Sequence, residues 1–187
     1  MGEADRLRKL VDHAFTASRW HVADLTDHEF FHAPTTPCWG VWWRDEAPRE
    51  HVMGGGAWVV DTHGSDAPLV PTIGWRLLHL AVWTDIYRDW TFGIRRPRPD
   101  EYEYPGNAAD AVAWLERAQE AFAKDVHALS DSDVQTMRPT HTGVRRSAGD
   151  IVWDLAIEHT HHGAEIGVLR DLIRGRPRDD EFPGPWV

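Results

Sequence analysis

The segment Glu158-His159-Thr160-His161-His162-Gly163-Ala164-Glu165 places three histidines and two carboxylates within about two helical turns. Residues four apart lie on the same face of a helix, so Glu158 and His162 point in nearly the same direction. Imidazole and carboxylate groups are zinc ligands, and a catalytic zinc ion commonly has three protein ligands and one position for water or substrate. The spacing therefore predicts one arm of a metal site, whose third ligand must come from elsewhere in the chain.

The best candidate for the third ligand is His79. It shares a helical stripe with large apolar residues, namely Trp75, Val82, Trp83, Ile86 and Trp90. This period predicts that His79 faces the interior of the protein. A lone histidine on an apolar face is more often a hydrogen-bonded core residue. A second inward-facing arm in the same fold favours metal binding, because metal sites in bundles are built from facing helices.

Helix phase sorts the histidine-rich segment further. At about 100° per residue, the expected buried face contains Leu155, Ile166, Leu169 and Ile173, with Ile151 close by. His162 falls in the middle of this face, Glu158 and Glu165 lie toward one edge, and His159 lies on the other edge. His161 points well away. A ligand set that includes His159 or Glu165 remains an alternative, as does a hydrogen-bonded Glu-His pair without metal.

Four long helices are expected to position these residues. Apolar residues recur at threes and fours, and capping residues precede most of these segments, which predicts helices at about 3–25, 73–91, 107–129 and 147–175, the last ended by Gly175 and Pro177. Thr26 and Glu29 resemble a capping box that begins a short extra turn. The Gly-, Pro- and Trp-rich stretch up to Pro71 predicts a loop-rich insertion with room for one small hairpin. The expected fold is all-α, a four-helix bundle in a single domain over residues 1–187.

Composition limits the classes of function. A single cysteine, Cys38, cannot form an internal disulfide, and the charged N-terminal segment lacks the apolar core of a signal peptide, so a cytoplasmic protein is expected. No stretch approaches the ~20 apolar residues of a membrane span. The net charge of −10, with basic residues scattered among acidic ones, argues against nucleic acid as a partner. A small molecule is the expected partner, and some of the 11 tryptophans can line its pocket.

Two phrases, TIGWRLLHLAVWTDIYRDWTFG and IVWDLAIEHTHHGAEIGVLRDL, resemble the DinB superfamily, as does the segment PTTPCWGV. They are especially similar to the branch that includes mycothiol-dependent maleylpyruvate isomerase. The resemblance implies an up-down-down-up four-helix bundle that holds one divalent metal ion, usually zinc and sometimes nickel, on three side chains. By motif position these are His79, Glu158 and His162, the same set that helix phase favours. Nitrogen and oxygen ligands also accept cobalt or iron(II).

The resemblance further implies a metal-dependent enzyme that acts on a small molecule. The leading hypothesis is an S-transferase or isomerase that uses mycothiol or a similar low-molecular-weight thiol as a metal-bound thiolate. Glu165, His159 and Tyr87 are candidates for proton transfer, although each can equally be structural. One alternative is a zinc hydrolase or lyase that uses metal-bound hydroxide. Another is a non-catalytic protein that binds metal or ligand, and pairing into a homodimer is compatible with all of these. Specificity is expected to lie in the loops at 33–71 and 130–146.

Overall fold

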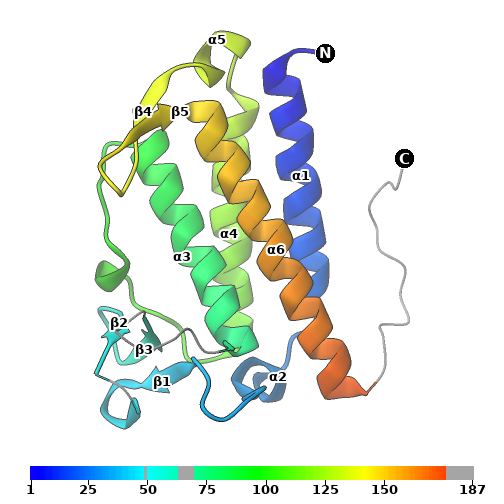
Figure 1. Ribbon diagram of the computed structural model, residues 1–187, viewed down its shortest axis with the longest axis vertical. Coiled ribbons are helices and arrows are strands. Elements are labelled where there is room, and N and C mark those ends of the chain that lie inside the picture. Colours follow the sequence, from blue (N-terminus) through cyan, green and yellow to red (C-terminus); the bar gives the residue numbers. More distant parts are fainter. Residues whose placement is uncertain (49, 63–69, 176–187) are drawn as a thin grey trace.

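The computed structural model describes residues 1–48, 50–62 and 70–175. Within these ranges four long helices pack side by side (Figure 1), namely α1 (Glu3–Val22), α3 (Ile73–Thr91), α4 (Ala108–His127) and α6 (Ala148–Arg174). Helix α1 contacts α6 and α4, and α3 contacts α4 and α6. In Figure 1, α1 and α6 run from top to bottom, whereas α3 and α4 run from bottom to top. The prediction of a mostly helical chain is confirmed.

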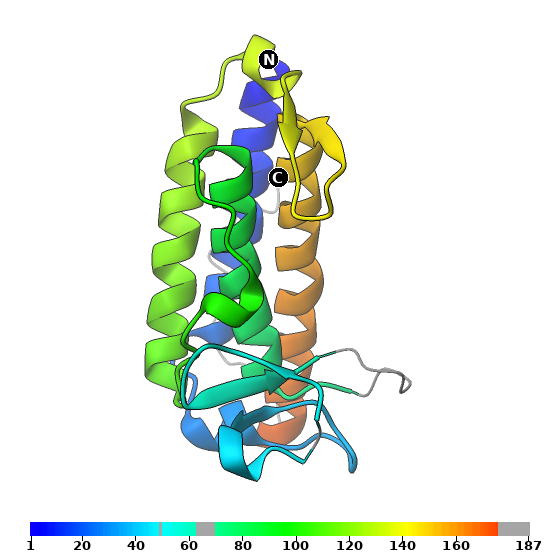
Figure 2. The same ribbon diagram turned by 90° about the vertical axis from the view of Figure 1, so that its left-hand side faces the viewer.

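Short helices and strands lie at both ends of the group of four long helices (Figure 2). The insertion after α1 contains α2 (Asp27–Phe31), a 3₁₀ turn η1 (Arg44–Glu46) and the strands β1 (Val41–Trp43), β2 (Val52–Met53) and β3 (Trp58–Asp61). These strands form an antiparallel sheet in the order β1-β3-β2, so the insertion is more regular than the single hairpin that the sequence allowed. A second 3₁₀ turn, η2 (Pro99–Glu101), lies between α3 and α4.

A further hairpin precedes α6 and corrects the expectation of an all-α fold with a plain polar loop there. After the short helix α5 (Asp131–Val134), the strands β4 (Met137–Pro139) and β5 (Arg145–Ser147) pair antiparallel. The turn between them uses Gly143 at φ 82°, a left-handed conformation that glycine adopts without strain. Strands of three residues with mostly polar side chains carry no alternating apolar pattern, which is why periodicity did not reveal them.

Hydrogen bonds from side chains fix where three of the long helices begin. The side chains of Thr72, Asn107 and Ser147 each accept a hydrogen bond from a backbone N–H in the first turn of α3, α4 and α6. The predicted capping box of Thr26 and Glu29 is present at α2. Gly175 ends α6 in the left-handed conformation, at φ 67°. Pro177, the other expected terminator, lies outside the described residues.

The buried face of α6 differs from the expected one. His159 has no exposed surface and lies at the centre of this face, whereas Glu158 and His162 lie at its edge and are partly exposed. The reason is close packing against α1. A Cβ atom at Gly163 would lie 3.3 Å from Ser18, and one at Gly167 would lie 2.4 Å from the His21 ring. Small residues of α6 therefore form its contact surface with α1. A prediction based only on the large apolar residues of α6 places the centre of the buried face in the wrong position.

A buried ion pair ties α2 to the last turns of α6. The Arg170 guanidinium, in a residue 1% exposed, donates hydrogen bonds to the Glu29 carboxylate at 3.0 and 3.2 Å. It also donates to the backbone carbonyls of His21 and Ala23, each at 2.7 Å. Burial alone would raise the pKa of Glu29, but hydrogen bonds from Arg170 and from the Thr26 backbone lower it to about 2. The pair fixes the end of α1 and the start of the insertion against α6.

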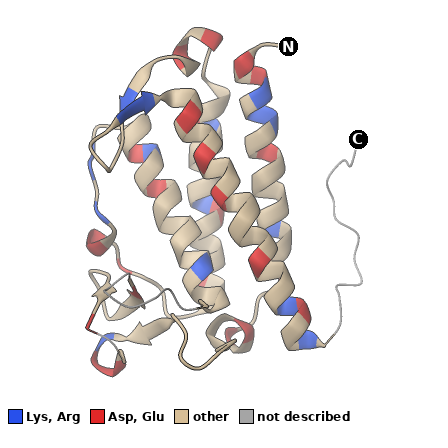
Figure 3. Ribbon diagram, viewed as in Figure 1, with Lys and Arg blue, Asp and Glu red and all other residues tan. Residues whose placement is uncertain are grey.

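Figure 3 shows acidic and basic residues interspersed along the helices in this view. No helix in the described part of the chain is both long enough and apolar enough to cross a bilayer.

Candidate metal centre

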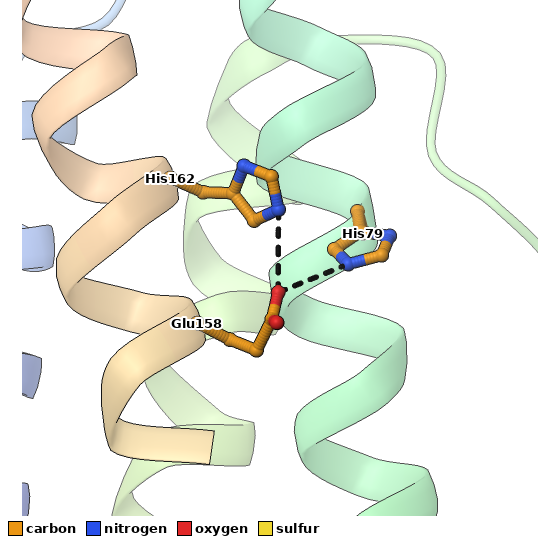
Figure 4. A group of neighbouring side chains, drawn as sticks. All are labelled: His79, Glu158 and His162. Carbon is orange, nitrogen blue, oxygen red and sulfur yellow. Dashed lines mark ion pairs between the residues drawn. The ribbon is translucent and has the colours of Figure 1, made fainter. Parts of the chain in front are cut away.

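The structure brings His79, Glu158 and His162 together between α3 and α6 (Figure 4). One Glu158 carboxylate oxygen, Oε2, lies 3.3 Å from His162 Nε2 and 3.7 Å from His79 Nε2. One ligand atom from each of the three residues lies within 4.8 Å of the others, which is a spacing that a single metal ion can span. Glu158 and His162 are one turn apart on α6, and His79 faces them from α3, so two helices together supply the group.

The other nitrogen of His162 is held by a carboxylate. His162 Nδ1 donates a hydrogen bond to Glu165 Oε2 at 2.6 Å, and the same oxygen accepts one from Arg76 Nε at 2.9 Å. When Nδ1 carries the proton of a neutral imidazole, Nε2 is the acceptor, and Nε2 is the atom that faces Glu158 and His79. Metal-binding histidines commonly have such a carboxylate partner, which fixes both tautomer and ring orientation. The donor set and its support therefore fit a divalent metal ion.

A second group of possible ligands shares one residue with the first. His161, His162 and Glu165 also bring ligand atoms within 4.8 Å of one another. The His161 side chain is 61% exposed, and Glu165 already pairs with the Arg76 guanidinium. A metal ion at Glu165 would lie beside that positive charge and would compete for a carboxylate already in use. The first group has no such conflict, because no guanidinium pairs with Glu158 in the described part of the chain.

The charges of the first group are strongly coupled. The neighbouring imidazoles of His162 and His79 hold the pKa of Glu158 far below its usual range, and their effect outweighs that of its burial. Burial lowers the pKa of His162, but the carboxylates of Glu158 and Glu165 together raise it by a larger amount, so the net shift is upward. The His79 ring stacks on Trp75, with centroids 5.0 Å apart at an interplanar angle of 17°. Metal binding at these residues would release a proton from any imidazole that carries one.

A cavity of about 420 Å³ opens beside the group, and both His79 and Glu158 line it. One wall is the α3 stripe Trp75, His79, Trp83 and Tyr87, whose members are four residues apart. Leu155 and Glu158 of α6 also line the cavity. Met53 of β2, Thr62 just after β3 and Pro99 of η2 are further lining residues. His141 closes the side near the β4–β5 turn. Tyr87, a predicted proton-transfer residue, therefore lies in the same cavity as two of the predicted ligands.

Arg76 and His141 were missing from the sequence-based candidates. Arg76 is 5% exposed, and its position three residues before His79, in an otherwise apolar first turn of α3, was a usable signal, because a buried guanidinium needs a partner. His141 lies in a polar turn and offered no pattern. Only the hairpin brings its ring to Trp83 and Tyr87, at centroid distances of 4.6 and 5.3 Å.

His159, the third proton-transfer candidate, lies apart from the cavity in the core. Its Nε2 is 2.8 Å from Thr84 Oγ1, and its Nδ1 is 3.1 Å from Gln119 Nε2 and 3.4 Å from Ser18 Oγ. The Phe15 ring meets it edge-on, with centroids 4.5 Å apart. These contacts place His159 in a polar network that connects α1, α3, α4 and α6.

Acid should destabilise the protein through His159. Burial lowers the pKa of His159 to about 3, below its ordinary value of 6.5. Between these values the unfolded chain binds a proton that the folded chain does not, so stability falls as the pH drops from about 6.5 toward 3. We expect His159→Gln to reduce the slope of unfolding free energy against pH by up to about one proton. Urea unfolding from pH 7 to 4 in the presence of a chelator measures this slope, and equal slopes in both proteins would contradict the expectation.

The helical fold of this protein, with a possible His-Glu-His metal site between two helices, is of a metalloprotein-like class. The family model of the DinB superfamily matches residues 10–166, and the chain belongs to this superfamily. A search of curated proteins found no match, and neither did a search of solved structures.

Proposed function

We propose that the protein is a metal-dependent enzyme that acts on a small molecule, with a low-molecular-weight thiol of the mycothiol type as co-substrate. We propose further that the chain is a single domain whose long helices form an up-down-down-up bundle, with His79, Glu158 and His162 as ligands of a divalent metal ion. One observation carries the proposal: a His-Glu-His group, oriented by Glu165, borders an aromatic-lined cavity of about 420 Å³.

The charge of the ligand set supports a thiol as co-substrate. Two neutral imidazoles and one carboxylate would leave a divalent ion with net positive charge, which favours an anionic ligand in the open position. Zinc is the first candidate, and nickel, cobalt and iron(II) accept the same donors. When bound, such an ion supplies Lewis acidity that lowers the pKa of a thiol and stabilises the thiolate.

The surrounding residues would orient the reactants. Glu165, itself held by Arg76, accepts the hydrogen bond from His162 Nδ1, so the Nε2 of that ring keeps one direction. Burial, together with the negative charges of Asp154 and Glu158, raises the pKa of Tyr87, so its hydroxyl stays protonated and can donate a hydrogen bond in the cavity. In S-transfer, sulfur forms a bond to an electrophilic carbon and the leaving group departs with its electron pair. In isomerisation the thiol adds and is later eliminated, so it is regenerated.

Titration of the cobalt-substituted protein with mycothiol tests the proposal. We expect a change in the visible cobalt spectrum and saturable heat in calorimetry, both lost in His79→Ala. His161→Ala is the matched control, because it removes a neighbouring imidazole that does not border the cavity. If cobalt binds but neither mycothiol nor bacillithiol changes the spectrum, the thiol-dependent reaction is wrong, and assays for a hydrolase or lyase become the next step.

A further inference from the structure

We propose that the cavity beside the candidate metal group binds an uncharged, flat aromatic or conjugated ligand, which lies against Trp83 of α3 and His141 of the β4–β5 turn. The inference builds on the proposed function in taking this ligand as the small molecule on which the protein acts. It names a substrate class, and it makes the hairpin before α6 the carrier of a residue that determines specificity.

The shape of the cavity favours a flat ligand. Trp83, Tyr87 and His141 form a cluster of rings beyond His79, with the His141 ring 4.6 Å from Trp83 and 5.3 Å from Tyr87 between centroids. The rings are inclined to one another, at 49° for Trp83 and His141 and 80° for Trp83 and Tyr87, so they present both faces and edges to the cavity. Aromatic rings bind another ring well in offset or edge-on arrangements. A volume of about 420 Å³ lies within the range of about 300–1,000 Å³ that is usual for small-molecule pockets.

The charges around the cavity favour an uncharged ligand. Among the lining residues that the structure describes, Glu158 is the only acidic one, and none is a lysine or an arginine. Among the described arginines near the cavity, Arg76 pairs with Glu165, Arg146 with Asp154 and Arg98 with Asp100. On Tyr87 the negative charges of Asp154 and Glu158 each act more strongly than the positive charge of Arg146. An anionic group at the end of the cavity away from the metal ligands would therefore lose its hydration without gaining a cationic partner.

His141 can form hydrogen bonds with such a ligand. Burial against the neighbouring rings lowers its pKa, so the imidazole is neutral at pH 7 and can both donate and accept. The hydroxyl groups of Thr62 and Tyr87 have the same dual capacity and line the same cavity. Three neutral polar groups in an aromatic pocket suit a hydroxyl or carbonyl substituent better than a carboxylate. His141 lines the cavity and is an exposed residue, so we infer that it lies at the mouth of the cavity.

The test compares two fluorinated probes of nearly equal size, uncharged 4-fluorobenzyl alcohol and anionic 4-fluorobenzoate. Both are titrated into the metal-free full chain and followed by fluorine NMR. We expect the alcohol to bind at least ~10-fold more tightly than the benzoate, because only the benzoate must bury a charge. Trp83→Leu should weaken alcohol binding by about 10-fold and His141→Ala by about 3- to 10-fold. His127→Ala should change it by less than ~2-fold, since His127 lies on α4, pairs with Asp12 and does not line the cavity.

Equal affinities for the two probes, or alcohol binding that neither Trp83→Leu nor His141→Ala weakens, would overturn the inference. His141→Ala decides the matter if Trp83→Leu fails to fold, because His141 is an exposed turn residue. The probes need no metal ion, so this result is separate from the metal-content measurements that test the proposed function. Metal retention without probe selectivity rejects the ligand class alone, and probe selectivity without metal binding rejects the metal-dependent function alone.

Discussion

Replacing His79 by alanine should remove tightly bound metal from the protein. His79 supplies the ligand from α3, and without it only Glu158 and His162 of α6 remain in the group. We expect the affinity for zinc to fall by more than ~100-fold, because losing a direct ligand should exceed the about 10- to 100-fold effect of losing an outer partner. Elemental analysis of untagged protein and competition with a chromophoric chelator measure this loss. Stoichiometric zinc of unchanged affinity in His79→Ala would reject the assignment.

His161→Ala is the discriminating control for that experiment. His161 belongs only to the competing group with His162 and Glu165, whereas His79 belongs only to the first. Zinc affinity should therefore stay unchanged in His161→Ala, and the reverse pattern would move the site to the exposed face of α6. Glu165→Gln should give an intermediate loss of about 10- to 100-fold, because it weakens the partner of His162 Nδ1 and leaves all three ligands in place.

Arg170→Leu should destabilise the fold by about 3 kcal/mol, because it leaves the Glu29 carboxylate buried without its main partner. It also removes the donor to two backbone carbonyls at the end of α1. Chemical denaturation at pH 7 measures the change. Arg174→Ala is the matched control: its side chain is 31% exposed and contacts the same carboxylate at 2.9 Å, so its cost should stay below about 1 kcal/mol. Equal costs for the two variants would contradict the role given to Arg170.

The same ion pair predicts a difference at acid pH. The pKa of Glu29 is about 2 in the folded chain, against an ordinary value of 4.5. Its contribution is therefore fully present above about pH 4.5 and is lost as the pH falls toward 2. In Arg170→Leu much of that contribution is already missing, so stability should fall less steeply over this interval than in the unchanged protein.

Much of the helical framework follows from local sequence. Apolar periodicity indicates the long helices, and Thr72, Asn107 and Ser147 mark where three of them begin, because hydrogen bonds at a helix end involve residues close in the chain. The short strands escape such analysis. Pairing of β4 with β5, or of β1 with β3, depends on partners across a turn, and segments of three or four residues carry little pattern of their own.

Some features of the candidate site also follow from local sequence, whereas others depend on packing between helices. The spacing of Glu158 and His162 within one helix places both on one side of α6, and an apolar stripe with one histidine points to His79. Helix phase erred on His159, because it counted large apolar residues and α1 packs instead on Gly163 and Gly167. Because of that packing, the His159 side chain points into the core, and Glu158 and His162 lie at the edge of the buried face of α6, where they face α3.

The sequence by itself determined the four long helices, the starting points of three of them and the local pair of ligand types, since these depend on neighbours within about one helical turn. Tertiary structure alone decided which atoms meet. It placed Arg76 against Glu165, oriented Nε2 of His162 toward Glu158, and brought His141 over Trp83 from a hairpin more than fifty residues further along the chain. Contacts between distant segments depend on how whole helices pack, and that packing depends on side-chain volumes from every helix at once.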